Sequence, residues 1–278
     1  MTKKWFSARV AITYAILFGL AIIVGFPLFW MAISSFKTSP ELFTYPPKLI
    51  PSDFTTEWYD AVFFRSNAPR LFQNSFVVAV ATMVIDIVIA TLGAYSVTRF
   101  KYPGRNLLMF TALISYLFPA IILLVPMFRI LSSLNLVNSI QGIIVTHIIV
   151  TLPFALWLLR SFFQSIPRDL EEAALVDGAT YLGAFTRIVL PLTAPGVMST
   201  GLFVFILSWN EYLFASVMGT SEANKTLPVG IADFVTSFDI RWGEIMALST
   251  VTTIPVLIFF AFIQKYFVKG LMAGAVKG

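Results

Sequence analysis

The sequence contains no cysteine and only one histidine, His147, in 278 residues. A chain without cysteine has no disulfide framework, no thiolate metal site and no cysteine nucleophile. A single histidine also excludes the histidine-rich sites that hold catalytic zinc. We therefore expect no metal and no cofactor in this chain.

Charged residues are scarce as well. They make up 12% of the chain, about half the share in a typical soluble domain, while 58% of the residues are hydrophobic. The mean hydropathy is +0.85. So few charges could not cover the surface of a globule in water. The composition excludes a soluble enzyme, a disordered chain and a coiled coil, and it indicates a polytopic membrane protein.

Long uncharged runs predict where the chain crosses the bilayer. About 20 apolar residues in a helix cross a hydrocarbon core roughly 30 Å thick. The runs are continuous, whereas the strands of membrane barrels alternate. Four prolines within the runs, Pro119, Pro126, Pro153 and Pro255, can kink the helices. We predict an all-α membrane protein with six transmembrane helices, at residues 11–33, 73–98, 106–128, 141–159, 191–217 and 245–264.

Basic residues predict the orientation. Twelve of the 19 Lys and Arg fall on one side when the six spans alternate in direction. They precede the first span, follow the last, and lie between spans two and three and between spans four and five. The positive-inside rule places this side, and both termini, in the cytoplasm. The pI of about 9.5 then reflects topology in the cell membrane, and we expect no nucleic-acid partner.

We divide the chain into three parts. Residues 1–72 hold the first span and a proline-rich outer loop, which we interpret as a lateral cap on the bundle. The first apolar stretch is about twice the length of a secretory signal core, and no cleavage motif follows, so we interpret it as a retained helix. Residues 73–268 form the membrane core, and residues 269–278 form a cytoplasmic tail.

The cytoplasmic connection 163–190 is too long for a simple turn. Asp169 followed three residues later by Glu172 is a capping-box pattern, which predicts a helix over residues 170–176. The Asp-Gly pair that ends at Gly178 is typical of a left-handed helix stop. We therefore predict a short helix that stands below the membrane.

A second helix of this loop is expected to begin at Thr180 and to end before Pro191. The alternative for the loop is an amphipathic helix that lies on the bilayer. Anionic headgroups attract basic faces, and three acidic residues of the loop argue against this alternative: Glu171, Glu172 and Asp177.

The fixed residues of this loop resemble the EAA motif of ATP-binding-cassette importer permeases, EAA-x3-G-x9-I-x-LP. Every fixed position is present at the right spacing. The resemblance implies the bundle of a type I importer permease, and it makes the loop the coupling helix that docks into an ATPase subunit. The coupling residues that it implies are Glu172, Ala173, Ala174, Asp177, Gly178, Ile188, Leu190 and Pro191.

Further segments resemble maltose-type carbohydrate permeases. They are Ser35-Phe36-Lys37-Thr38 with Glu41-Leu42-Phe43, Trp209-Asn210-Glu211-Tyr212, the stretch Thr226 to Gly230, and the tail Gly270 to Gly278, in which Met272 departs from the usual small polar residue. This resemblance implies five partners besides membrane lipid: a second homologous permease subunit, two ATPase subunits that bind ATP and Mg²⁺, an extracytoplasmic solute-binding protein, and a sugar.

The chain has no phosphate-binding loop of its own. The pattern GxxxxGK does not occur, and the dipeptide Gly-Lys is absent altogether. We therefore expect a transport subunit and not an enzyme, with ATP hydrolysed by the partner subunits.

Polar side chains inside the spans are candidates for a substrate path. Asp86 lies midway along the second span, where a carboxylate costs about 2.5–3.5 kcal/mol and usually faces an interior contact or a wet cavity. Trp209, Asn210 and Glu211 combine an indole, an amide and a carboxylate, which suits a sugar. The alternative is that these groups only satisfy neighbouring helices or backbone. His147 is expected to be a hydrogen-bonded interior imidazole.

The outer loop over residues 219–244 is a candidate docking surface for the binding protein, as the family resemblance implies. The alternative is a solvated, re-entrant connector. The docking residues that we predict are Glu222, Lys225, Asp233 and Asp239.

The leading hypothesis is a permease subunit that moves a di- or oligosaccharide by alternating access driven by its ATPase partners. An alternative keeps this architecture but imports glycerol phosphate or a glycerophosphodiester. An alternative of another class is a secondary transporter that uses Asp86 and Glu211 as proton carriers. The last alternative leaves the EAA loop unexplained.

Overall fold

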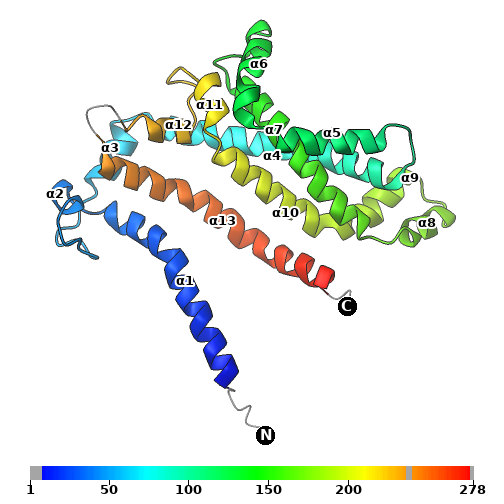
Figure 1. Ribbon diagram of the computed structural model, residues 1–278, viewed down its shortest axis with the longest axis horizontal. Helices are drawn as coiled ribbons and strands as arrows, with labels where there is room; N and C mark the ends of the chain where they lie inside the picture. The colour runs from blue at the N-terminus through cyan, green and yellow to red at the C-terminus, as the bar shows by residue number, and fades with distance from the viewer. Residues whose placement is uncertain (1–7, 236–239, 276–278) are drawn as a thin grey trace. The chain divides into compact units, whose positions relative to one another are not determined.

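The computed structural model describes residues 8–235 and 240–275. In that part of the chain the regular elements are all helical, and two residues, Val235 and Ile240, form an isolated antiparallel bridge. Figure 1 shows the helices in chain order from blue to red. The predicted all-α fold is confirmed.

Five helical segments are long and apolar enough to cross a membrane, and a bent pair makes a sixth if it counts as one span. The prediction of six spans is confirmed in this sense. The five lie in α1 (Ala8–Ser34), α4 (Ala68–Arg99), α7 (Ile140–Gln164), the run Tyr181–Trp209, and α13 (Trp242–Ala275). Because α13 continues to Ala275, most of the predicted tail 269–278 is helical, and residues 276–278 lie outside the described part.

We predicted one continuous helix for the third span, and this prediction is wrong. The span consists of α5 (Arg105–Leu117) and α6 (Ala120–Ser133), which are bent by 105° at the break. Pro119 lacks an N–H, and a residue before proline is pushed into the extended region, as Phe118 is with ψ 133°. The chain therefore leaves the helix at Phe118, whereas Pro126 stays inside α6.

The fifth span is also displaced from its predicted position, 191–217. It runs continuously through α9 (Tyr181–Ala184), a π-helix (Phe185–Val189) and α10 (Leu190–Trp209), and the short α11 (Leu213–Met218) is separate. The prediction that the second loop helix ends before Pro191 is wrong. In the π-helix the Leu190 N–H bonds to the Phe185 carbonyl oxygen, five residues back. Pro191, which has no N–H, is the second residue of α10 and follows directly after this π-helix, where the regular pattern of bonds four residues back is already interrupted.

The chain divides into two compact units, which we describe separately. Unit 1 comprises residues 1–68 and 231–254, and unit 2 comprises residues 69–230 and 255–278. The outer loop of unit 1 contains α2 (Ser39–Leu42) and α3 (Glu57–Phe64), and α12 (Leu227–Ala232) follows α11. The lateral-cap interpretation of the outer loop stays a prediction.

Lys37 stabilises the outer loop of unit 1 through contacts with three of its neighbours. Its side chain is buried, its Nζ lies 3.9 Å from the centroid of the Trp30 ring, and it donates to the Lys48 carbonyl oxygen at 2.8 Å. Trp58 Nε1 donates to the Lys37 carbonyl oxygen at 2.7 Å. Burial lowers the pKa of the Lys37 ammonium from its usual value, and the Glu41 carboxylate opposes this shift. Within unit 1, Lys37 therefore has a structural role.

The core of unit 2 lies where α4, α5, α7 and α10 pack together. Ala90 and Ala94 of α4 and Ala155 of α7 are fully buried in one apolar cluster, which also includes Leu159 and Val204. Small side chains let helix backbones approach closely, and this increases the van der Waals contact that helps to hold helices together in lipid. The packed helices set the positions of the polar groups described next.

Candidate functional site

Loop 163–190 contains the short helix that we predicted. Helix α8 spans Asp169–Val176, one residue longer than expected. The capping box is wrong, because Arg168 is the N-cap, has helical dihedral angles and makes no side-chain cap bond. Asp169 is already the first helical residue and cannot cap the helix. Its charge, with those of Glu171 and Glu172, still stabilises the first turn through the helix dipole.

The helix stops at Gly178 as predicted. Gly178 has φ +86°, in the left-handed region, and the Ala179 N–H bonds back to the Ala174 carbonyl oxygen at 2.9 Å. The next helix begins after Thr180, whose Oγ1 accepts from the Gly183 N–H at 3.1 Å. Two short helical segments therefore flank one glycine turn.

Helix α8 has an exposed face and a buried face. Glu172 and Ala173 are exposed, whereas Glu171 and Ala174 are buried. Large apolar side chains also lie on the exposed surface of the loop: Leu170, Val176 and Leu182, with 45%, 87% and 69% of their surface exposed. Exposed apolar groups beside charged ones are typical of a surface that binds another protein. Of the other predicted coupling residues, Asp177, Gly178 and Pro191 are exposed, and Ile188 and Leu190 are half-buried.

The buried face is fixed by residues that the sequence analysis missed. Glu171 accepts a hydrogen bond from the Tyr95 hydroxyl, and its Oε2 lies 2.8 Å from Arg99 Nε. Tyr95 and Arg99 belong to α4, more than 70 residues earlier in the chain. The available signal was that Arg99 directly follows the second predicted span and that Glu171 lies in a cytoplasmic loop on the same side of the membrane, but no local pattern pairs them.

The Gly178→Val variant is expected to loosen loop 163–190. No atom lies within 4 Å of a Cβ built at Gly178, so only the backbone conformation opposes a side chain there. An ordinary residue in the left-handed region costs about 1–2 kcal/mol, whereas asparagine tolerates that region better. Trypsin cleavage after Arg187 should become about tenfold faster in Gly178→Val. Gly178→Asn should stay close to the unchanged protein, and equal rates for the two variants would contradict the argument.

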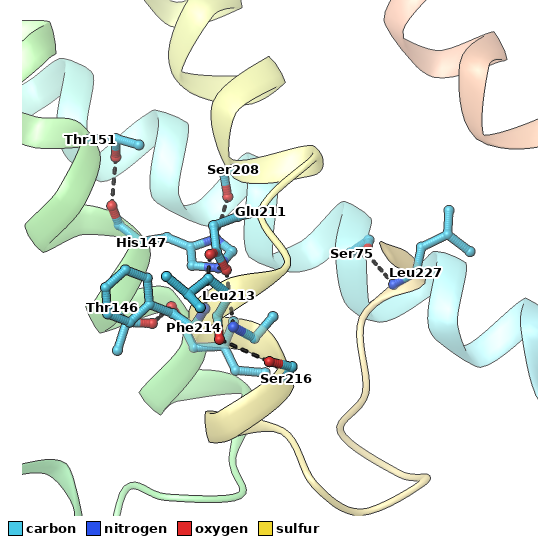
Figure 2. Close-up of polar contacts among 12 residues, drawn as sticks. Ser75, Thr146, His147, Thr151, Ser208, Glu211, Leu213, Phe214, Ser216 and Leu227 are labelled. Atoms are coloured by element: carbon cyan, nitrogen blue, oxygen red, sulfur yellow. Dashed lines mark hydrogen bonds and ion pairs between the residues drawn. The ribbon is translucent and has the colours of Figure 1, made fainter. Parts of the chain in front are cut away.

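A chain of polar contacts, buried except at Glu211, links α4, α7 and the end of α10. The Thr151 hydroxyl donates to Asp86 Oδ2 and lies 2.7 Å from the His147 carbonyl oxygen. The His147 ring lies between Ser208 Oγ, 2.7 Å from Nδ1, and Glu211 Oε2, 3.0 Å from Nε2 (Figure 2). His147 is thus a hydrogen-bonded interior imidazole, as expected.

Glu211 also holds the start of α11. Its Oε1 accepts from the Phe214 N–H at 2.8 Å, and its Oε2 accepts from the Ala215 N–H at 3.0 Å. Both carboxylate oxygens are therefore occupied by backbone donors at the break between α10 and α11. This geometry favours the alternative in which Glu211 satisfies backbone groups.

The other predicted path residues have different surroundings. Trp209 is buried, with its ring 5.5 Å from those of Phe72 and Phe205. Asn210 is exposed, and its Nδ2 donates to the Ile206 carbonyl oxygen at 2.8 Å. Asp86 and Glu211 belong to one chain of polar contacts, but the Trp209 indole packs among aromatic rings. Contact of these four residues with substrate stays a prediction.

The predicted docking residues fall in different parts of the chain. Glu222 and Lys225 form an ion pair in unit 2, with 70% of the Glu222 side chain exposed. Asp233 belongs to unit 1, and Asp239 lies outside the described residues. The Asn74 amide donates to the carbonyl oxygen of Lys225 at 2.8 Å. A single docking surface of these residues stays a prediction.

Comparison with known proteins identifies the family. The chain matches the family described as "Binding-protein-dependent transport system inner membrane component" over residues 87–272. It is 39% identical over 262 residues to the trehalose/maltose transport system permease protein MalG of Thermococcus litoralis, covering 93% of this chain and 94% of that protein. It is 38% identical over 276 residues to the trehalose transport system permease protein SugB of Mycobacterium tuberculosis, covering 98% and 99% of the two chains.

The fold is similar to that of a solved transporter chain. A chain from the crystal structure of a bacterial ABC transporter involved in the import of the acidic polysaccharide alginate superimposes with a TM-score of 0.80 at 24% identity. The match covers 96% of this chain and 100% of that chain. The family match excludes the secondary-transporter alternative and places ATP hydrolysis in partner subunits. The chain is therefore a multi-pass transport subunit of the cell membrane, and it belongs to the family of binding-protein-dependent transport system inner membrane components.

Proposed function

We propose that this chain is a permease subunit of an ATP-driven importer that carries a sugar, most simply a di- or oligosaccharide, by alternating access. It pairs with a second homologous permease subunit, two ATPase subunits that bind ATP and Mg²⁺, and an extracytoplasmic binding protein. Loop 163–190 faces the cytoplasm with both termini and receives the movement of an ATPase subunit.

The observation that carries the proposal is the two-sided loop 163–190. Its outer face presents Glu172, Ala173 and Val176 to a partner, while its inner face is bonded to a membrane helix through Glu171. A protruding element of this kind can receive a displacement from a docked protein and pass it into the bundle. The family match supports the same assignment.

The substrate class rests on the relatives. The relatives from Thermococcus litoralis and Mycobacterium tuberculosis are named as permeases for trehalose/maltose and for trehalose, and both align over more than nine-tenths of this chain. These names favour a sugar over the glycerol phosphate alternative. Direct contact of sugar with Asp86, Trp209, Asn210 or Glu211, and docking of the binding protein at Glu222, Lys225, Asp233 and Asp239, are parts of the proposal.

Reconstitution of the complete importer in proteoliposomes tests the proposal. The probes are radiolabelled trehalose and maltose, with glycerol 3-phosphate as the comparison solute. We expect sugar uptake that requires ATP, the ATPase subunits and the binding protein, and that continues when a protonophore collapses the proton gradient. Uptake that persists without the ATPase subunits, or a preference for glycerol 3-phosphate, would contradict the proposal.

A further inference from the structure

Helix α4 holds the inner face of loop 163–190. The Tyr95 hydroxyl donates to Glu171 Oε1, and Arg99 Nε lies 2.8 Å from Glu171 Oε2. Only 6% of the Arg99 side chain and 7% of the Glu171 side chain are exposed, so most of this ion pair is removed from bulk water. Tyr95 and Arg99 are four residues apart and therefore share one face of α4.

Further bonds join the same two segments. The Arg99 guanidinium donates to the Ile166 carbonyl oxygen at 3.1 Å, and Arg168 donates to the Thr98 carbonyl oxygen. Because the donors lie on both segments, the end of α4 and residues 166–171 are bonded in both directions. They have little freedom to move independently.

The segment that leaves loop 163–190 also packs against Tyr95. The ring of Tyr95 lies 4.6 Å from that of Phe185 in the π-helix and 6.0 Å from that of Phe163 at the end of α7. Both Phe163 and Phe185 are buried. The segments that enter and leave loop 163–190 therefore pack against one residue of α4.

A cavity connects the ion pair with the exposed face of α8. It has a volume of about 160 Å³, and Glu172 and Leu175 line it together with Arg99 and Glu171. Glu172 is exposed to solvent, whereas Glu171 is buried. The ion pair therefore lies directly behind the face of α8 that the proposed function assigns to an ATPase subunit.

The other end of α4 is bonded to residues 219–230, the part of the outer loop 219–244 that belongs to unit 2. The Asn74 amide donates to the carbonyl oxygens of Ala223 and Lys225 at 3.0 and 2.8 Å. The Leu227 N–H donates to Ser75 Oγ at 2.7 Å, as Figure 2 shows. One helix therefore carries contacts to both loops that lie at its two ends.

Helix α4 is also suited to move as one piece. Apart from Pro69 in its first turn it contains no proline, whereas the other span-length helices each contain an internal one: Pro27 in α1, Pro153 in α7, Pro195 in α10 and Pro255 in α13. Sharp helix kinks occur at proline, at Gly/Ser pairs and at π-bulges, and α4 is one uninterrupted α-helix. Arg99 lies 24 residues after Ser75, which is about 36 Å along the helix at 1.5 Å per residue.

We propose that α4 is the rigid link between loop 163–190 and the outer residues 219–230, and that Glu171, Arg99 and Tyr95 are the positioning residues that join α4 to loop 163–190. The inference rests on the proposed function, in which loop 163–190 receives the movement of an ATPase subunit. Displacement of α8 alone would separate a buried ion pair, which is strongly unfavourable, so α4 moves with it. Asp86 lies on the same helix, and the displacement therefore reaches the polar contacts around His147.

The test uses the complete importer with Glu171→Gln, Arg99→Gln, Arg99→Lys and Tyr95→Phe, and with the double variant Glu171→Gln/Arg99→Gln. Glu171→Gln removes the charge but keeps the shape, and Tyr95→Phe removes only one hydroxyl. Asp169→Asn is the matched control, because it removes a charge from the same turn of α8 at an exposed position. Three quantities are measured: the ATPase subunit that co-purifies, the basal ATPase rate, and the sugar imported per ATP when the binding protein is present.

We expect Glu171→Gln to lower the sugar imported per ATP about fivefold, the lower part of the usual range for coupling between two sites, and Tyr95→Phe to lower it less. Arg99→Lys keeps the positive charge, so this variant should import more sugar per ATP than Arg99→Gln does. Co-purification, basal ATPase rate and the Asp169→Asn importer should stay unchanged. The double variant should import little less sugar per ATP than either single variant, because both substitutions remove the same Glu171–Arg99 ion pair.

Two results would overturn the inference. One is an unchanged ratio of sugar to ATP in Glu171→Gln and Tyr95→Phe. The other is a loss of co-purifying ATPase in these variants, which would assign Glu171 to the docking surface. Failure of the unchanged chain to bind an ATPase subunit would instead refute the proposed function, so the two failures are distinguishable.

Discussion

Replacing Glu211 by alanine is expected to destabilise the break between α10 and α11 by about 3 kcal/mol and to lower uptake at least about tenfold. The carboxylate accepts from the backbone N–H groups of Phe214 and Ala215 and lies 3.0 Å from the Nε2 of His147. A buried donor that loses its acceptor costs about 1–3 kcal/mol, and Glu211→Ala leaves at least two backbone donors without one. Uptake by the complete importer and its thermal unfolding are the measurements.

Glu211→Gln sharpens the test, because both oxygens of the carboxylate accept backbone N–H groups. A glutamine places its own NH₂ against one of these donors, so its effect should approach that of alanine. The matched control is Glu57→Ala, since Glu57 is exposed in the first turn of α3 and should change stability by less than about 0.5 kcal/mol. Uptake by Glu211→Ala equal to that of Glu57→Ala would refute the structural role of the carboxylate.

Gly142→Ala is expected to destabilise the permease by about 3 kcal/mol, at the upper end of the usual cost of overpacking. A Cβ at Gly142 would lie 2.0 Å from the Leu136 carbonyl oxygen, which is backbone and cannot rotate away. The turn that follows cannot shift freely, because the Asn138 N–H donates to the Met218 carbonyl oxygen at 2.7 Å. The free energy of unfolding in detergent, from a denaturant titration, checks this expectation.

Gly201→Ala is the matched control, and its effect should have the opposite sign. A Cβ there would meet its nearest neighbour, Ile87 Cγ1, at 3.6 Å, which is an ordinary contact. Alanine within a helix is more stable than glycine by about 0.5–1 kcal/mol. Equal stability of Gly142→Ala and Gly201→Ala would contradict the close approach of the Leu136 carbonyl oxygen to Gly142.

Local rules explain which parts of loop 163–190 could be predicted. The end of α8 follows from an Asp-Gly pair, because glycine accepts the left-handed conformation that Gly178 adopts with φ +86°. The start of the next helix follows from Thr180, which caps it. The motif that identified the family lies in the same short segment, so both the local fold and the class of protein were accessible from the sequence.

Contacts between distant segments were not accessible. Glu171 and Tyr95 are 76 residues apart, and the sequence does not show which charged residue at a span border meets which partner. Prolines were equally ambiguous, because Pro119 and Pro126 occupy one apolar run, yet the chain breaks at the first and stays helical at the second. Whether a helix continues or breaks at a proline depends on whether neighbouring helices supply hydrogen-bond partners for the freed backbone groups.

The contact between Asp86 and Thr151 constrains how the protein is made. Thr151 comes 65 residues after Asp86, so at ~5–20 residues per second it leaves the ribosome ~3–13 s later. During that interval α4 enters the bilayer with a bare carboxylate, which costs about 2.5–3.5 kcal/mol. The strongly apolar remainder of α4 must therefore offset this cost at the moment of insertion, before Thr151 can contribute its hydrogen bond. Variants that make α4 less apolar should fail at translocon insertion, before any transport step can be assayed.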